Sequence, residues 1–420
     1  MRQSGVTTSV APDGPRASRH LGLALLALAI GGFAIGTTEF VTMGLLPQIA
    51  DGVHISIPTA GHVVSAYAIG VVVGAPVIAA LGARTGRKRL LLGLMAVFVI
   101  GNVLSAVANS YELLMAARFL TGLPHGAFFG IGAVVGTSMV PANRRAWAVS
   151  MIMVGLPVAN IIGVPLTTLL GQRLGWQIPF LAVGVLGLLT LVAVWFWVAP
   201  QPVGNDVNVR SELSALAKPQ VWMALLVGMV GFGGMFATYS FITPTMTELA
   251  GFSETAVTIV LAVYGVGMTG GTLVGGRLAD RALMPSLYGG LVAVTIVLGT
   301  FGWLAQSKPG ALIGVFAMGF SASILIPALQ TRLMDVAHEG QSLAASLNHS
   351  TLNVANALGA WLGSVVLSAG YGYEWPSRVG AVLAVAGLVL ALVSGLMDRR
   401  TGRAVGEGTT SPAVEGYSQR

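Results

Sequence analysis

Residues 21–47 read LGLALLALAIGGFAIGTTEFVTMGLLP, an almost unbroken apolar run with one ionisable side chain, Glu39. A transmembrane helix needs about 20 consecutive, mostly apolar residues, so this run is long enough to cross a bilayer. It is too long for the apolar core of a signal peptide, and eleven more such runs follow it. The sequence therefore predicts a multi-pass membrane protein.

The overall composition supports this prediction. Of the 420 residues, 55% are hydrophobic and 9% are charged, whereas a soluble domain carries about 25% charged residues. The runs are continuously apolar, which predicts helices, because the strands of a membrane barrel would alternate polar and apolar residues. The twelve predicted spans cover roughly residues 21–47, 58–82, 90–109, 112–138, 146–171, 177–199, 220–247, 255–279, 285–305, 310–331, 342–369 and 377–397.

The basic residues predict the orientation, because Lys and Arg concentrate on the cytoplasmic side of a membrane. With a cytoplasmic N-terminus, eighteen of them fall in inside segments and three in outside loops, Arg173, Lys308 and Arg378. Arg118 remains within a span. We therefore expect a multi-pass protein of the inner, cytoplasmic membrane with both termini in the cytoplasm.

The chain repeats itself at an offset of 196–197 residues. The motif Y-x-x-G-x-x-x-G occurs at 67–74 and 264–271, and V-A-N-x-x-G occurs at 158–163 and 354–359. The first pair falls in spans 2 and 8, and the second in spans 5 and 11. The repeat predicts an all-α fold of two parallel six-helix bundles, a design typical of secondary transporters. The predicted parts are a cytoplasmic tail (1–20), the first bundle (21–199), a cytoplasmic linker (200–219), the second bundle (220–398) and a cytoplasmic tail (399–420).

Several local motifs resemble those of a known family. They are GTTEF at 36–40 in span 1, RFLTG at 118–122 in span 4 and GLPVANIIGVP at 155–165 in span 5. Together with the twelve spans, they resemble the major facilitator superfamily over residues 21–398, especially chloramphenicol exporters and arabinose or sugar-efflux transporters of the drug:proton antiporter branch. The resemblance implies proton-coupled export and links Arg118 with proton coupling. The span 5 motif has Ala-Asn where the antiporter signature has Gly-Pro.

The loops after spans 2 and 8 resemble the family's conformational latch on the cytoplasmic side. They read GARTGRKR at 82–89 and GRLADR at 276–281. The first copy keeps the basic residues but has Ala83 at the acidic position, and the second copy keeps the Asp-Arg pair. The resemblance implies latch roles for Arg84, Arg87, Lys88, Arg89, Asp280 and Arg281.

Glu39 and Arg118 are the strongest functional candidates from the residues alone, since ionisable side chains within a bilayer are costly and usually face the interior of the bundle. Counting helical rise, Glu39 lies about 12 Å and Arg118 about 9 Å inside the outer ends of their spans. They could pair directly or through water or substrate. Burial raises and a nearby cation lowers the pKa of a carboxyl group, so opening and closing of a cavity would change its proton affinity. The alternative is a static structural ion pair.

His125 lies two helical turns beyond Arg118 on the same face, and we expect it to take part in proton coupling. The alternative role for His125, and for His349 in span 11, is packing. Polar and aromatic residues within the spans are candidates for a substrate cavity near the midplane, although some must bond neighbouring helices instead. These candidates are Tyr67, Asn102, Asn160, Tyr239, Tyr264, Gln330, Asn353 and Asn356.

The sequence lacks the motifs of other function classes. It has no cysteine and only three lysines, none of which follows a glycine, so it contains no P-loop for ATP. We expect no enzyme activity, no cofactor, no metal site and no nucleic-acid partner. The expected partners are a small-molecule substrate, protons and the lipid bilayer, and we expect the protein to be a monomer. The predicted function is proton-coupled export of a small amphipathic compound, first a chloramphenicol-type antibiotic. Alternatives are export of sugars or their metabolites, uptake by the same fold, and a non-transporting membrane receptor or scaffold.

Overall fold

The computed structural model describes residues 15–82, 85–141, 145–200, 215–337 and 341–407, and every regular element in this part is helical. Twelve of its segments are long and apolar enough to cross a membrane, at the places that the apolar runs predict. The twelve-helix fold is therefore confirmed. The parts of the predicted linker and tails at 201–214, 1–14 and 408–420 lie outside the described residues.

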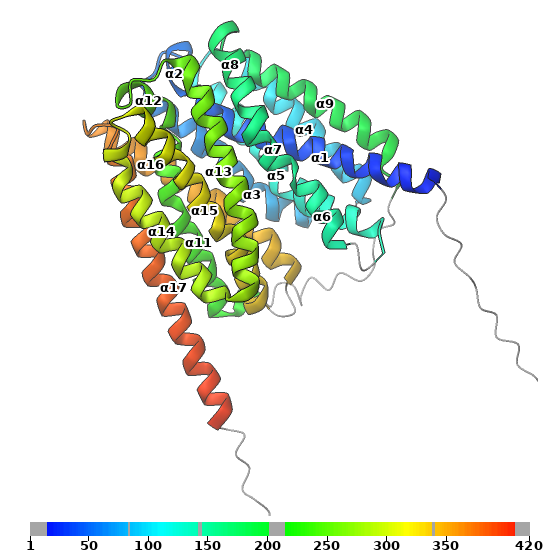
Figure 1. The fold of residues 1–420 in the computed structure, drawn as a ribbon. Helices are drawn as coiled ribbons and strands as arrows, with labels where there is room; N and C mark the ends of the chain where they lie inside the picture. The colour runs from blue at the N-terminus through cyan, green and yellow to red at the C-terminus, as the bar shows by residue number, and fades with distance from the viewer. Residues whose placement is uncertain (1–14, 83–84, 142–144, 201–214, 338–340, 408–420) are drawn as a thin grey trace, which may run out of the picture.

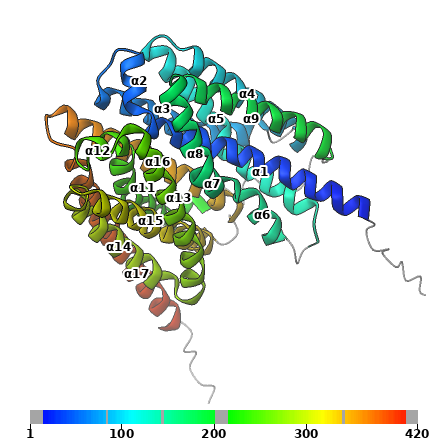
Figure 2. The same ribbon diagram turned by 45° about the horizontal axis from the view of Figure 1, so that its top comes forward.

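The helices form two groups, which meet near α2 and α12 and diverge toward the start of α1 and the end of α17 (Figures 1 and 2). The N-terminal group contains α1 (Pro15–Gly44), α2 (Leu46–Gly52), α3 (Ile57–Gly82), α4 (Arg87–Val107), α5 (Tyr111–Ser138), α6 (Arg145–Met153), α7 (Gly155–Val158), the π-helix η2 (Ala159–Gly163), α8 (Val164–Leu174) and α9 (Ile178–Trp197). The C-terminal group contains the 3-10 helix η3 (Ala215–Ala217), α11 (Pro219–Tyr239), α12 (Ile242–Glu248), α13 (Glu254–Arg281), α14 (Leu283–Leu304), α15 (Lys308–Ala337), α16 (Gln341–Ser368) and α17 (Trp375–Glu407).

Three predicted spans are interrupted rather than continuous. The first breaks at Leu45 (φ −114°, ψ 16°) and the seventh at Phe241 (φ −112°, ψ 25°), with nearly the same backbone geometry at equivalent positions. The fifth is divided into α6, α7, η2 and α8. Pro157 explains its first break, because proline has no N–H to bond the carbonyl of Met153. The second group's equivalent helix, α16, contains no proline and is continuous.

Glycines of the repeated motif allow the same close helix packing in both groups. A Cβ on Gly70 would strike the carbonyl oxygen of Phe119, and a Cβ on Gly267 would strike that of Phe316, 197 residues further on. Gly74 and Gly271 meet backbone carbonyls of α5 and α15 in the same way. The sequence repeat is thus a repeat of contacts, in which α3 packs on α5 and α13 packs on α15.

Between the two groups, α3 packs on α16, and α13 packs on η2 and α8. Gly265 of α13 lies directly against the backbone of Asn160, where an added Cβ would lie 2.6 Å from the carbonyl carbon. The described hydrogen bonds that join the groups lie toward the end that carries α2 and α12, which we call the α2/α12 end. They are Thr243 Oγ1 to Met43 O (3.2 Å) and Gly44 O (3.0 Å), Gln48 Nε2 to Glu254 Oε2 (2.8 Å), Gln172 Nε2 to Glu254 O (2.8 Å), Ser364 Oγ to Pro58 O (2.7 Å), Ser364 Oγ with His62 Nε2 (3.3 Å), and Ser65 Oγ to Ala357 O (3.1 Å).

We expect Gly271→Val to destabilise the protein by about 1–3 kcal/mol, because the larger side chain forces α13 away from α15. The matched control is Gly289→Val, at an exposed helical glycine with nothing within 4 Å of the added Cβ. Thermal unfolding in detergent measures both. Equal midpoints for the two variants would contradict the packing role of the motif.

Candidate functional site

Arg118 of α5 is fully buried, and α1 holds its guanidinium in place. Nη1 donates to Thr38 Oγ1 at 3.0 Å, and Nη2 donates to the Thr38 carbonyl at 2.9 Å. The Thr38 hydroxyl in turn donates to Asn102 Oδ1 at 2.7 Å. These bonds fix the arginine at the contact of α1, α4 and α5.

Two aromatic rings enclose the same guanidinium. Its carbon lies 4.5 Å from the ring centre of Tyr67 and 5.4 Å from that of Phe180. A cation over an aromatic face is attracted by the ring quadrupole, and more strongly where water is excluded. The position of the Arg118 guanidinium is therefore fixed by contacts within the N-terminal group. Sequence reasoning missed Thr38 and Phe180, although Thr38 directly precedes Glu39 in the chain.

Glu39 is also buried, with 6% of its surface exposed. It lies within electrostatic range of Arg118, as the predicted depths require. The two do not form an ion pair, however: the pair found among the described residues is Arg332 with Asp398. Glu39 therefore has no ion-pair partner among the described residues, and both Nη atoms of Arg118 bond Thr38 instead.

The surroundings of Glu39 come from both helix groups, with Tyr67 and Arg118 from the N-terminal group and Asn356 and Tyr264 from the C-terminal group. The Asn356 amide of α16 faces the carboxyl group without closing a hydrogen bond. Phe40, next along α1, packs edge-on against Tyr239 at 5.9 Å, and Tyr239 stacks on Tyr264 at 3.9 Å. Glu39 therefore lies where the two groups meet, among predicted cavity residues from both.

His125 lies at a second contact between the groups. Its Nδ1 is 3.0 Å from the Tyr67 hydroxyl, and its ring centre is 6.2 Å from that of His349 on α16. Phe129 stacks on His349 at 5.6 Å. A chain of polar and aromatic contacts thus leads from Arg118 through Tyr67 to His125 and across to α16. The role of His125 in proton coupling stays a prediction.

The other predicted cavity residues have different surroundings. Asn102 is wholly engaged, since its Nδ2 donates to Phe98 O at 2.9 Å and its Oδ1 accepts from Thr38. Gln330 accepts a bond from Asn348 at 3.1 Å within the C-terminal group. Asn160 and Asn353 are buried with their carbonyl oxygens unbonded. The structure thus gives Asn102 and Gln330 supporting contacts and leaves the other two with free acceptors.

The described residues of the predicted latch lie at the opposite end from α2 and α12. Arg84 is outside the described residues. Arg87 and Lys88 are half-buried, and Lys88 donates to the carbonyl of Trp195 at 2.6 Å. Arg89, Asp280 and Arg281 are exposed, and none of them forms an ion pair with another described residue. The latch stays a prediction.

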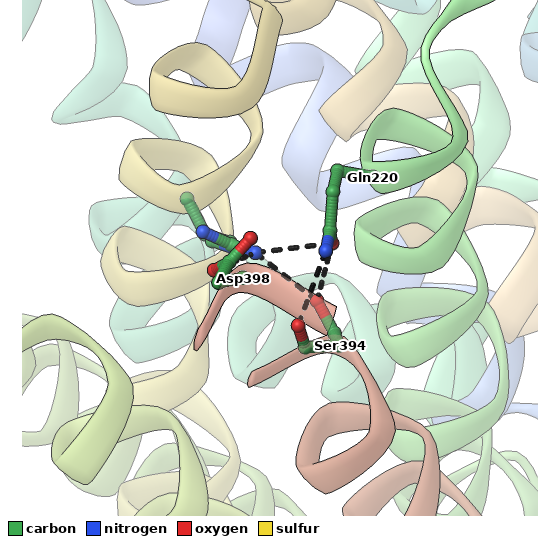
Figure 3. Close-up of polar contacts among 4 residues, drawn as sticks. Gln220, Ser394 and Asp398 are labelled. Atoms are coloured by element: carbon green, nitrogen blue, oxygen red, sulfur yellow. Dashed lines mark hydrogen bonds and ion pairs between the residues drawn. The ribbon is translucent and has the colours of Figure 1, made fainter. Parts of the chain in front are cut away.

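A further polar cluster, at the start of α11, near the end of α15 and in the second half of α17, was not predicted. Arg332 pairs with Asp398 at 2.6 Å and donates to Gln220 Oε1 and Ser394 Oγ, both at 3.1 Å (Figure 3). A cavity of about 450 Å³ lies beside it. All these residues belong to the C-terminal group, so the cluster ties three of its helices together and does not join the two groups.

We expect Thr38→Val to lower the free energy of unfolding by about 1–3 kcal/mol, because buried Arg118 and Asn102 each lose a partner. The matched control is Thr37→Val, since among the described residues the Thr37 hydroxyl bonds only the carbonyl of Phe33 in its own helix. Thermal unfolding in detergent compares the two. If both variants lose the same free energy of unfolding, the hydrogen bond from Arg118 to Thr38 contributes no more to stability than the bond within the helix.

Comparison with known proteins agrees with this architecture. Residues 28–342 match the family model described as Major Facilitator Superfamily. The chain is 45% identical to the inner membrane transport protein YdhP of Escherichia coli K12 (88% of this chain, 94% of the relative) and 33% identical to a chloramphenicol resistance protein of Streptomyces lividans (88% and 95%). A bacterial homologue of the lysosomal transporter Spinster, solved in an inward-facing and unoccupied conformation, shares the fold with a TM-score of 0.69 at 17% identity, over 96% of this chain and all of that one. The family resemblance is confirmed, and the chain belongs to the Major Facilitator Superfamily of membrane transporters.

Proposed function

We propose that this transporter exports a small amphipathic compound in exchange for protons, with Glu39 as the group that carries the proton. The observation that carries the proposal is a buried carboxyl group with no ion-pair partner among the described residues, next to an arginine that is bonded elsewhere. A static structural pair would satisfy both charges at once. A carboxyl group without such a partner is free to gain and lose a proton as its surroundings change.

The position of Glu39 supports coupling to movement of the two helix groups. Its neighbours Tyr264 and Asn356 belong to the C-terminal group, so separation of the groups would change the environment of the carboxyl group. Repeated bundles that rock against each other give a transporter alternating access to its central site. The proton affinity and the conformation are then linked through one residue.

The distribution of basic residues indicates which end of the molecule faces the cytoplasm. It favours a cytoplasmic location for the linker and both termini and an outside location for the α2/α12 end. The hydrogen bonds between the groups gather toward the α2/α12 end, and the groups diverge at the other (Figure 1). We therefore infer that this conformation is closed to the outside and open to the cytoplasm, ready to accept a substrate for export from an inner membrane.

The substrate proposal rests on similarity to named relatives. A relative named as a chloramphenicol resistance protein is 33% identical over most of its length, which favours an antibiotic of that type. Export of a sugar or sugar metabolite is the second candidate, because the span 1 and span 4 motifs also resemble sugar-efflux transporters. Membership of a transporter family favours either of these over a non-transporting receptor or scaffold.

We expect Glu39→Gln to abolish export of chloramphenicol that is driven by a pH gradient in proteoliposomes, because glutamine cannot take up a proton. Downhill exchange persists, since the amide keeps the size and much of the hydrogen bonding of the acid. The matched control is Glu112→Gln, an exposed acid in the first turn of α5, which should retain uphill export.

A double variant separates coupling from structure. If Glu39 and Arg118 only neutralise each other, removal of one charge destabilises the fold and removal of both restores it. Uphill, proton-driven export by the Glu39→Gln, Arg118→Gln variant at the wild-type rate would rule out the coupling role of Glu39.

A further inference from the structure

Three asparagines near the contact between the helix groups have side-chain oxygens that accept no hydrogen bond from any described residue. They are Asn160 of η2 and Asn353 and Asn356 of α16, and each is at most 3% exposed. Buried polar atoms are normally bonded, so an unpaired buried acceptor calls for an explanation. All three lie on helices at the contact between the groups, so they are acceptors available to a solute that binds there.

The neighbouring backbone fixes which amide atom is unpaired. Asn160 Nδ2 donates to Leu156 O at 3.1 Å, and Asn353 Nδ2 donates to His349 O at 3.0 Å. Turning either amide over would place its oxygen against a carbonyl oxygen, and two acceptors repel each other. The free atom is therefore the acceptor in both residues, and the donor is used within the helix.

The face of α16 that carries Asn353 points toward the N-terminal group. His349, one turn before it, stacks on Phe129 at 5.6 Å, and the carbonyl of Ala357, one turn after it, accepts a bond from Ser65 at 3.1 Å. Residues four apart share a helix face. Asn353 therefore lies between two contacts that cross from one group to the other.

The other two asparagines lie at the same contact. Asn356 faces Glu39 of α1. The backbone of Asn160 touches Gly265 of α13, the residue after Tyr264, so closely that an added Cβ would not fit. The stacked rings of Tyr239 and Tyr264 lie beside Glu39. Asn356 and Tyr264 thus lie beside the proposed proton carrier, and Asn160 lies against Gly265, the residue next to Tyr264.

We propose that this transporter selects uncharged solutes that donate several hydrogen bonds, such as compounds with clustered hydroxyl or amide N–H groups on an apolar frame. The inference rests on the proposed export function and narrows its substrate class. Asn160, Asn353 and Asn356 accept the solute's O–H or N–H groups, the unbonded Asn356 Nδ2 and Tyr239 hydroxyl are available to its hydroxyl oxygens, and the tyrosine rings contact its apolar face. A site with preset acceptors strongly disfavours an analogue without donors, because the buried acceptors then stay unpaired.

The test uses matched pairs of probes in which O-methylation removes the hydroxyl donors: chloramphenicol and its di-O-methyl ether, and methyl arabinopyranoside and its fully O-methylated ether. Equilibrium binding to the purified full-length protein and export from proteoliposomes are both measured. We expect each parent compound to bind about ten-fold or more tightly than its ether, although the ether is the more lipophilic. Equal binding of parent and ether, or binding of neither parent, would overturn the inference.

Variants assign the effect to the acceptors. Asn353→Leu and Asn160→Leu should raise KM for the parent about ten-fold and leave the weak binding of the ether unchanged, which a merely structural loss would not do. The matched control is Thr351→Val on the same helix, whose hydroxyl bonds Leu347 O and whose methyl group lies against Gly228 of α11. If both asparagine variants weaken parent and ether alike, the acceptors do not select the substrate.

Failure of the inference and failure of the proposed function give different results. If the ethers are exported by a pH gradient as well as their parents, proton-coupled export stands and the donor selection falls. If the parents bind better than the ethers but no gradient moves them, the donor selection stands and the export function falls.

Discussion

The bidentate hold of Thr38 on Arg118 is the constraint on which the proposed site depends. A buried guanidinium needs hydrogen-bond partners, and here the hydroxyl and the backbone carbonyl of Thr38 on α1 each accept a bond from one of its two Nη atoms. Asn102 completes the arrangement from α4, and Tyr67 and Phe180 exclude water from it. The consequence is a buried carboxyl one residue away, within the field of a cation but not bonded to it. That combination permits a change of protonation, which a closed ion pair would resist.

The two halves share their packing but not their chemistry. The glycine motif brings α3 onto α5 and α13 onto α15 through equivalent carbonyl contacts. Glu39, Arg118 and His125 belong to the first half, and the positions facing them in the second half are mainly amides and tyrosines. The N-terminal group thus contributes the ionisable side chains of this site, and the C-terminal group contributes mainly neutral side chains that can form hydrogen bonds. Movement of the second group would change the surroundings of Glu39 and Arg118, while both side chains stay in the first group.

The sequence predicts the fold well because its signals are long and repeated. Twelve apolar runs and the Gly70/Gly267 repeat leave few alternatives, and the structure agrees. Breaks at Leu45 and Phe241 were not predicted, since hydropathy does not distinguish a bent from a straight apolar segment. Helical rise predicts that Glu39 and Arg118 lie at similar depth. It does not predict how each helix is rotated about its axis, or which neighbouring atom accepts a hydrogen bond from Arg118. For that reason the sequence suggested a possible Glu39–Arg118 pair and missed Thr38, and it could not separate engaged Asn102 from unpaired Asn353.

The central claim is that Glu39 changes its protonation state as the transporter binds substrate and moves. Difference infrared spectroscopy of the purified protein measures this directly, because a protonated carboxyl group and a carboxylate absorb at different frequencies. On addition of a transported substrate across a range of pH, the account predicts a change in the protonated-carboxyl band that is absent from Glu39→Gln and present in Glu112→Gln. An unchanged band in the wild type at every pH, with transport intact, would contradict it.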